Sequence, residues 1–492
     1  MDAATLSHVE CSAACASQPA GAQRHNISWS FLDNFTPVRD EVSVEHLPVY
    51  GTLPADLDGL YIRTGPNLQF LPPRRSHWLD GDGMLHAVAI ERGTASYRNR
   101  YVRTAVWHEE RRAGQALSTG LMRAPDLDAV RAGRSAYKNT ANTSVIVHHG
   151  RALALCETGM PYHIALPSLE TVGPYAIGHS ADHPFTAHPK CDPATGELLY
   201  IRYRLGVRPY VIYGILDPHG AVVHETGVAT PHPSMMHDFA VSAHYTLFLD
   251  LPLYFDIERA VRGASGWLYD PSLSARFGIL PRYAPGHQVR WFEGPACCVT
   301  HVVNLYEEGR EIVLLAVRYE ELPHLFTLDP PDEGARPTAP DAKRAYLHEW
   351  RFNLASSAVH ARRLDPTPVE FPRMNEQYIG RAARYTYLMY DVPQSGIVKY
   401  DAHTGRSQLR HHGTGRFGGE AVFVPRCGAH TEDDGYLLTY VWVGAQHRSE
   451  LLVFDARNFD AEPVARVALP VRVPFGLHGT FVPRTQLAGE CT

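Results

Sequence analysis

The feature that most restricts how this chain can fold is a strand–turn–strand unit that recurs along it. Clear copies span residues 211–227, 396–413 and 451–470. Asp and Gly at the turns supply local hydrogen bonds and permissive backbone angles, as β-hairpins require. Matching turn residues, such as Asp401 and Asp455, stand about fifty residues apart. A period near fifty residues, with several strands in each repeat, is typical of β-propeller blades.

Further copies of the unit complete the pattern. Looser ones span 85–104, 160–175 and 345–364, and strands around 298–318 can supply one more blade. We therefore predict an all-β fold, a seven-bladed β-propeller. A large sandwich or two stacked β domains is the alternative, but no change of composition divides the 492 residues into parts.

Two segments depart from the repeats. Residues 253–290 contain short helical stretches and apolar side chains, and we predict that they form a partly helical cap over one face of the propeller. Residues 1–30 are mostly small and polar and are expected to be a mobile N-terminal segment. The remainder, 31–492, is expected to be a single propeller domain.

Composition excludes several classes of protein. The formal net charge of −6 argues against a nucleic-acid-binding protein, which normally carries a basic face. No apolar run is long enough for a transmembrane helix, and the N-terminus lacks the basic and apolar regions of a secretory signal. The cytoplasm is therefore the expected location. None of the eight cysteines forms a Cys-x-x-Cys pair, so a cysteine-based zinc site is not expected.

Histidine is unusually abundant, with 28 residues, so any single histidine is weak evidence for a metal site. Four stand in strand-like settings and in different expected blades: His188, His237, His301 and His478. Propeller blades direct their innermost strands at a shared axis, so residues far apart in sequence can converge there. Their long spacing is therefore compatible with a joint metal site.

Several motifs accompany these histidines. They are GTLPADLDGLYIRTGPN at 51–67, HWLDGDGMLH at 77–86 and KNTANT at 138–143. Together with the four histidine motifs, which follow in the same order, they closely resemble the carotenoid cleavage oxygenase family. The resemblance covers essentially the whole chain after residue 30. The set is highly specific, whereas each motif alone is weak.

The resemblance implies Fe(II) on the propeller axis, held by the four histidines at 188, 237, 301 and 478. Imidazole suits Fe(II), and four protein ligands leave positions open for O2. The family also supplies three glutamates, which accept the non-ligating ring N–H groups of the histidines and fix their tautomers. The motif matches are Glu157, Glu370 and Glu420, each flanked by apolar residues.

Further family positions are expected near the iron or the substrate. Thr143 matches a residue near the open coordination site, although a locally bonded strand threonine is the alternative. Phe371 matches an aromatic residue of the substrate tunnel. Cys156 and Thr300 stand where many members carry aromatic residues beside the iron. These two departures indicate a roomier or differently shaped pocket.

The implied reaction is cleavage of a C=C bond of an apolar conjugated substrate by O2, giving two carbonyl products. Stilbene- and phenylpropanoid-cleaving relatives bind the phenol hydroxyl through a tyrosine, and the corresponding stretch 117–125 places Met122 there. Methionine is flexible and apolar and suits a polyene. We therefore predict a carotenoid or apocarotenoid substrate. Lys138, which can match a second phenol-binding residue, does not discriminate.

Three other functions stay open. They are cleavage of stilbenes or phenylpropanoids, isomerisation or binding of a retinoid-like lipid, and a non-enzymatic scaffold, which leaves the four histidines and three glutamates unexplained. No nicotinamide or flavin motif is present. A polyene barely dissolves in water, so the cap is expected to contact a membrane surface peripherally. The candidate residues, which packing beneath the cap explains equally well, are Trp267, Leu268, Phe277, Ile279 and Leu280.

Overall fold

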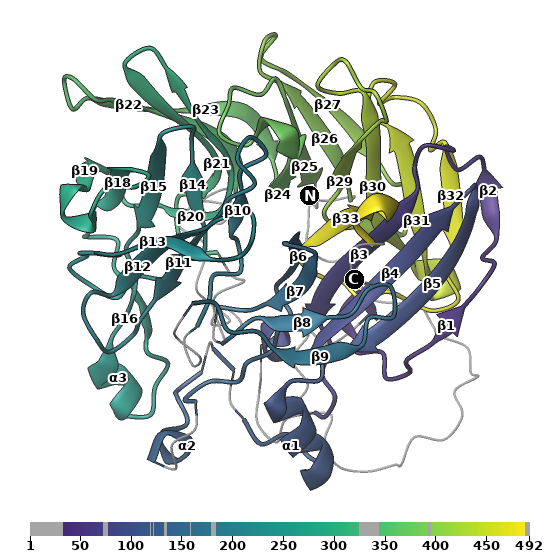
Figure 1. Cartoon of the computed structure of the whole chain (residues 1–492), viewed down its shortest axis with the longest axis horizontal. Helices are drawn as coiled ribbons and strands as arrows, with labels where there is room; N and C mark the ends of the chain where they lie inside the picture. The colour runs from purple at the N-terminus through teal and green to yellow at the C-terminus, as the bar shows by residue number, and fades with distance from the viewer. Residues whose placement is uncertain are drawn as a thin grey trace, which may run out of the picture.

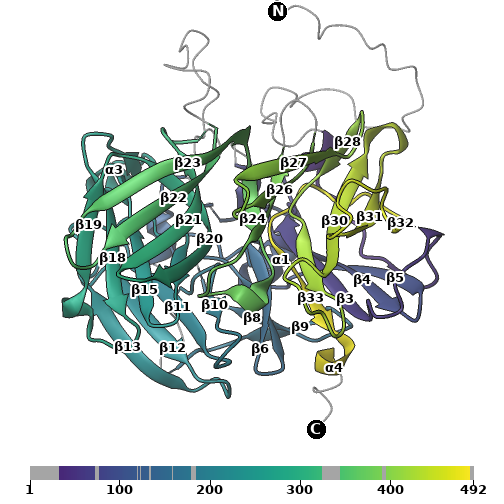
Figure 2. The same cartoon turned by 90° about the horizontal axis from the view of Figure 1, so that it is seen from above.

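A ring of seven β-sheets forms the body of the molecule in the computed structural model (Figures 1 and 2). The structure describes residues 33–71, 77–118, 120–121, 123–131, 135–157, 159–178, 184–323, 344–390 and 395–487. The segment 1–30 and Met122 lie outside these residues. The seven-bladed β-propeller predicted from the repeats is confirmed.

Five blades are four-stranded antiparallel sheets, and the first strand of each lines the centre of the ring. The first of these blades consists of β6 (Ser144–His148), β7 (Arg151–Leu155), β8 (Tyr162–Ile164) and β9 (Thr171–Pro174), and the second of β10 (Lys190–Cys191), β11 (Leu198–Tyr203), β12 (Val211–Leu216) and β13 (Val222–Val228). The third consists of β14 (Phe239–Val241), β15 (Tyr245–Asp250), β18 (Ala275–Pro281) and β19 (Arg290–Gly294), and the fourth of β20 (Cys298–Glu308), β21 (Glu311–Tyr319), β22 (Tyr346–Asn353) and β23 (Val359–Pro368). The fifth consists of β24 (Glu370–Arg373), β25 (Tyr385–Tyr390), β26 (Gly396–Asp401) and β27 (Arg406–His411).

The other two blades close the ring with strands from both ends of the chain. One consists of β1 (Ser43–Val44), β5 (Thr94–Tyr101), β4 (Gly83–Glu91), β3 (Gly59–Pro66) and, from the far end of the chain, β33 (Gly479–Pro483). The other consists of β28 (Arg416–Gly418), β29 (Val422–Pro425), β30 (Gly435–Val443), β31 (Arg448–Asp455), β32 (Ala465–Ala468) and, from the near end, β2 (Val49–Gly51). The ring therefore cannot open there without breaking sheet hydrogen bonds.

The hydrophobic core lies between the faces of adjacent blades. Between the two closing blades, for example, Tyr61 and Val88 pack with Leu438 and Val453, all of them buried. Alternate residues of a strand point to opposite faces of its sheet, so each blade contributes to the layers on both of its sides. The edges of the innermost strands then face the axis, where side chains can serve a site.

The cap is smaller than the segment 253–290 predicted for it. Strands β16 (Leu253–Phe255) and β17 (Trp267–Tyr269) pair with each other and enclose helix α3 (Ile257–Val261). After them the chain returns to its blade, because β18 pairs with β15. Figure 1 shows α3 along one edge of the ring with α1 (Ala105–Ala113) and α2 (Leu127–Arg131).

Other helical elements are short. Helix α4 (Arg484–Leu487) follows β33, and 3-10 turns occur at Asp33–Phe35, Trp78–Asp80, Gly286–Gln288, Glu376–Tyr378 and Gly444–Gln446. Among the described residues, no helix combines the length and the apolar character that crossing a bilayer requires.

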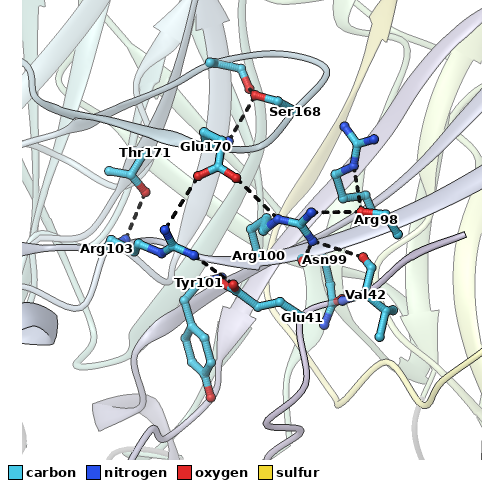
Figure 3. Close-up of polar contacts among 12 residues, drawn as sticks. Glu41, Val42, Arg98, Asn99, Arg100, Tyr101, Arg103, Ser168, Glu170 and Thr171 are labelled. Atoms are coloured by element: carbon cyan, nitrogen blue, oxygen red, sulfur yellow. Dashed lines mark hydrogen bonds and ion pairs between the residues drawn. The ribbon is translucent and has the colours of Figure 1, made fainter. Parts of the chain in front are cut away.

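Charged side chains join two neighbouring blades at the outer rim (Figure 3). Glu170, in the turn between β8 and β9, lies 3.5 Å from Arg100 and 3.7 Å from Arg103. Arg103 also donates a hydrogen bond of 2.9 Å to Glu41, which precedes β1. We call Glu41, Arg100, Arg103 and Glu170 the rim network.

Candidate metal centre

Four blades each bring one histidine to the propeller axis. His188 stands two residues before β10, His237 two residues before β14, His301 within β20 and His478 directly before β33. All four are thus at or near the start of a strand that lines the centre. Their candidate ligand nitrogens lie within 4.8 Å of one another. Sequence reasoning placed these histidines in separate blades, and the fold brings them together.

The geometry of the rings suits a single ion. Nε2 of His188 lies 3.0 Å from Nε2 of His237. The planes of neighbouring rings in the cluster are inclined to each other by 70° to 79°. Imidazoles that meet edge-on in this way direct their nitrogen lone pairs at a shared point, which is the donor set of a transition-metal site.

Three of the histidines hold a glutamate from another blade with their second ring nitrogen. The pairs are His237 with Glu157, His301 with Glu370 (2.6 Å) and His478 with Glu420 (2.9 Å). In each pair Nδ1 faces the carboxylate. When its N–H is donated there, the lone pair of Nε2 is left for a metal, and the ring is fixed in orientation. The three motif-matched glutamates therefore contact the predicted ligands.

Burial and neighbouring charges decide the protonation of the centre. Burial raises the pKa of Glu370, but His301 and several hydrogen-bond donors outweigh it and lower that pKa to about 2. The pKa of Glu420 is likewise lowered to about 2, because Arg373 and His478 outweigh the effect of burial. Burial and the other three imidazoles hold the pKa of His188 well below its usual range. Charged glutamates beside a neutral imidazole ligand suit a cation.

Two cavities meet at the histidines. One, of about 200 Å³, runs along the innermost strands, and its lining includes the charged residues Lys190 and Arg373. We call it the axial cavity. The other, of about 80 Å³, lies on the side of the cap and is mostly apolar, with Met235, Phe371 and Leu477 in its wall. We call it the apolar pocket.

The chain matches the family model described as retinal pigment epithelial membrane protein over residues 35–483. It is 38% identical to a carotenoid 9,10(9',10')-cleavage dioxygenase of Crocus sativus, with 93% of this chain and 90% of that protein aligned. The chain belongs to the carotenoid cleavage oxygenase family. The resemblance found in the motifs is confirmed, and the protein is an oxidoreductase of the oxygenase type.

Other members of the family differ in the substrates that their names give. An isoeugenol monooxygenase of Pseudomonas nitroreducens is 34% identical, aligned over 91% of this chain and 96% of that protein. The crystal structure of Pseudomonas brassicacearum lignostilbene dioxygenase superposes with a TM-score of 0.84 at 32% identity, over 93% of this chain and 98% of that one. A cobalt-substituted apocarotenoid oxygenase of Synechocystis gives 0.82 at 28% identity, over 93% and 99%.

Four residues that the carotenoid cleavage oxygenase motifs placed near the metal line the apolar pocket: Thr143, Cys156, Thr300 and Phe371. The ring centroid of Phe371 lies 5.2 Å from those of His301 and His478, so it forms a wall beside these two histidines. The hydroxyl of Thr143 donates to Asn142 at 3.0 Å. The local bonding considered as its alternative role is therefore present as well.

Sequence reasoning did not find the groups that complete the surroundings of the three glutamates. Each carboxylate has a further partner: Tyr203 for Glu157, Tyr319 for Glu370 (2.9 Å) and Arg373 for Glu420 (3.5 Å). These side chains occupy ordinary strand positions. No local pattern marks them, because their roles exist only where blades meet.

A cluster of buried charges lies beside the apolar pocket. The ammonium group of Lys138 contacts Asp82 and Glu110, each at 2.7 Å, and all three side chains are at most 4% exposed. Lys138 and Asp80 both reach the pocket wall. Burial raises the pKa of Asp80 to about 6. The pocket is thus apolar near the histidines and polar at this border.

Proposed function

We propose that this protein is a non-haem Fe(II) dioxygenase that cleaves a C=C bond of a carotenoid or apocarotenoid with O2 and releases two carbonyl products. The observation that carries the proposal is the convergence of four histidines from four blades, three of them bound to glutamates whose side chains are at most 14% exposed. This donor set suits Fe(II), which when bound supplies the redox chemistry toward O2.

The residues of the chain supply positioning and a dry site. Glu157, Glu370 and Glu420 hold the Nδ1 side of three imidazoles, so the ligand nitrogens stay directed at the axis. Phe371 and Met235 line the pocket beside them, where an alkene can lie against apolar walls with water excluded.

Three observations support a polyene substrate. The wall of the apolar pocket beside the histidines is largely apolar, and the relatives with 38% identity are carotenoid-cleaving by name. The ammonium of Lys138 is already bound by Asp82 and Glu110, which competes with any phenol hydroxyl for its donors. The argument from Met122 remains a prediction from sequence, because that residue lies outside the described part of the chain.

Cleavage of a stilbene or phenylpropanoid is the second candidate. The apolar pocket, at about 80 Å³, is smaller than the roughly 300–1,000 Å³ usual for ligand sites, which favours a small substrate. Asp80 at its border also offers a polar partner for a hydroxyl group. Isoeugenol monooxygenase and lignostilbene dioxygenase are relatives of this kind by name.

Turnover of an apocarotenal and of 4-hydroxystilbene by the iron-loaded protein, under identical aerobic conditions, tests the proposal. We expect two carbonyl fragments in the mass spectrum and a higher kcat/KM for the apocarotenal. A higher kcat/KM for the stilbene would replace the substrate class by the second candidate. A product of unchanged mass would instead indicate a lipid isomerase, and no turnover of either alkene would overturn the reaction.

We also propose that the cap contacts a membrane surface from which an apolar substrate is taken up. The residues predicted for this contact are mostly buried in the structure: Trp267, Phe277, Ile279 and Leu280. Packing explains them, because the last three lie in blade strand β18. Ile257 and Val261, one turn apart on α3, are instead 56% and 63% exposed.

Flotation with phosphatidylcholine liposomes tests the membrane contact. We expect the wild type to float and the double variant Ile257→Ser with Val261→Ser to remain in solution. Leu409→Ser, which removes an exposed leucine from β27 at the opposite edge of Figure 1, is the matched control and should float. A wild type that stays in solution, or a double variant that still floats, contradicts the proposal.

A further inference from the structure

We propose that Thr300 is a positioning residue, whose hydroxyl group holds Glu370 in the orientation that fixes the ligand His301. The inference rests on the proposed function in one respect, namely that the four histidines hold a metal ion. The sequence position of Thr300 suggests only that it lines the pocket wall. The role proposed here is a different one.

The pairing of β20 with β21 is irregular at Thr300, and this irregularity allows Thr300 to act in this way. Thr300 and His301 are adjacent, and in a regular strand their side chains would point to opposite faces. The pairing of β20 with β21 shifts register between Val299 and Val302. This irregularity lets both side chains reach one carboxylate: Thr300 donates to Oε1 of Glu370, and Nδ1 of His301 lies 2.6 Å from Oε2. Bulges commonly re-aim side chains beside active sites.

Glu370 is held by four groups. The hydroxyl of Tyr319 donates at 2.9 Å to the same oxygen as Thr300. The backbone N–H of Phe371 donates at 2.6 Å to the other oxygen, which also faces His301. Phe371 has a φ of 46°, in the left-handed region that residues other than glycine seldom adopt. Each carboxylate oxygen thus has two partners, and rotation of the carboxylate would break several bonds at once.

Removing the Thr300 hydroxyl therefore has a defined consequence. When a carboxylate oxygen shielded from solvent loses a hydrogen-bond donor and gains no water, its position becomes less stable. Oε1 would keep Tyr319 alone, so the carboxylate would be less well fixed. Because His301 is oriented by the same carboxylate, its ring would be fixed less firmly toward the metal.

The other two glutamates show the same principle with different donors. Glu157 receives the hydroxyl of Tyr203. Glu420 receives the backbone N–H of Gly479 at 2.8 Å. Each carboxylate that holds a ligand histidine is thus itself held by another donor. For Glu370, which holds His301, Thr300 and Tyr319 both supply such a donor.

Cobalt binding separates this role from simple packing. Thr300→Val keeps the shape of the side chain and removes the hydroxyl, whereas Thr300→Ser keeps the hydroxyl. Metal-free protein is titrated with Co(II) against a chelator, and the visible absorption of bound Co(II) reports the ligand geometry. We expect Thr300→Val to weaken Co(II) binding about 3- to 10-fold and to alter the spectrum. Loss of the carboxylate itself is expected to cost roughly 10- to 100-fold. Thr300→Ser should match the wild type.

Every result bears on the proposal. Unchanged affinity and spectrum in Thr300→Val overturn it, and so do equal losses in the Val and Ser variants, since these trace to packing. If Thr300→Val fails to fold, Thr300→Ala removes the same hydroxyl, and wild-type Co(II) affinity and spectrum in that variant overturn the proposal. A wild type that binds no Co(II) overturns the metal centre as well. Wild-type binding with an unaffected Val variant overturns the role of Thr300 alone.

Discussion

Carboxylates connect neighbouring blades both at the axis of this propeller and at its rim, but in very different surroundings. Glu420 beside His478 is 1% exposed, whereas Glu170 of the rim network is 52% exposed. Without competing water, each donor fixes the direction of a buried carboxylate strongly. At the surface, water and salt weaken the same contacts. Similar contacts therefore orient the histidine rings at the axis, while at the rim they tie segments together weakly.

The largest effect should come from removing ligands at the axis. His237→Ala combined with His301→Ala deletes two of the four ligand nitrogens, so we expect loss of bound metal and of turnover. The wild type should bind about one iron per chain, because the four histidines form a single site. Metal analysis and product formation check this. Full activity in the iron-free double variant would contradict the metal centre.

The next largest effect should come from the three carboxylates at the axis. Glu157→Gln, Glu370→Gln and Glu420→Gln keep the shape of the side chain but remove the charge that orients a histidine. We expect losses of roughly 10- to 100-fold in metal affinity or turnover for each. Glu170→Gln, the same change in the rim network, is the matched control and should leave both unchanged. Wild-type values in all three buried variants would show that the contrast between axis and rim is unfounded.

The pKa of Asp80 shows the effect of burial on a carboxyl group when nearby cations do not outweigh that effect. Its pKa in the folded protein is raised from 3.8 to about 6 by burial. The folded state then binds the proton more tightly than the unfolded chain. The stabilisation from this group is complete below about pH 4 and is lost as the pH rises through 6, a difference of about 3 kcal/mol at most.

The change Asp80→Asn removes this titration while keeping an acceptor for the backbone N–H of His77. We expect the variant to have a higher Tm than the wild type at pH 7 and a flatter dependence of Tm on pH between 4 and 6. Thermal unfolding across this range measures it. A variant with the same pH dependence as the wild type would show that Asp80 does not titrate there.

The smallest effect should be at the rim. Glu170→Gln breaks contacts of 3.5 and 3.7 Å to Arg100 and Arg103, both partly solvated. Exposed ion pairs contribute about 0–1 kcal/mol, and less in high salt. We expect a loss of unfolding free energy within that range in low salt, and none in 1 M NaCl. A loss of several kcal/mol of unfolding free energy that persists in 1 M NaCl would show that the rim network stabilises the fold as strongly as the buried contacts do.

The features that the sequence predicts well are those with a repeating or local signature. The turns near Asp401 and Asp455 mark blades, and the motifs around His188 and His478 mark members of the histidine cluster. The sequence does not locate the end of the cap, because the apolar residues of β18, such as Phe277, fit a cap surface and a blade core equally well. Pairing with β15 decides between them, and pairing is a property of distant segments.

The surroundings of the ligands were not predictable for a related reason. Tyr319 and Glu370 lie in different blades and meet only in the folded protein. The position of Thr300 depends on the register shift after Val299. Neither depends on residues close in sequence. A threonine in an apolar strand looks like a small wall residue until the partner of its hydroxyl is known.

The two-ended closure of the ring joins the histidine cluster to the last blade strand of the chain. His478 directly precedes β33, and β33 pairs with β3 from the other end of the chain. A polypeptide that stops short of residue 478 therefore lacks the fourth ligand and the closing strand together. Such a product can neither seal its ring nor assemble the full set of imidazoles.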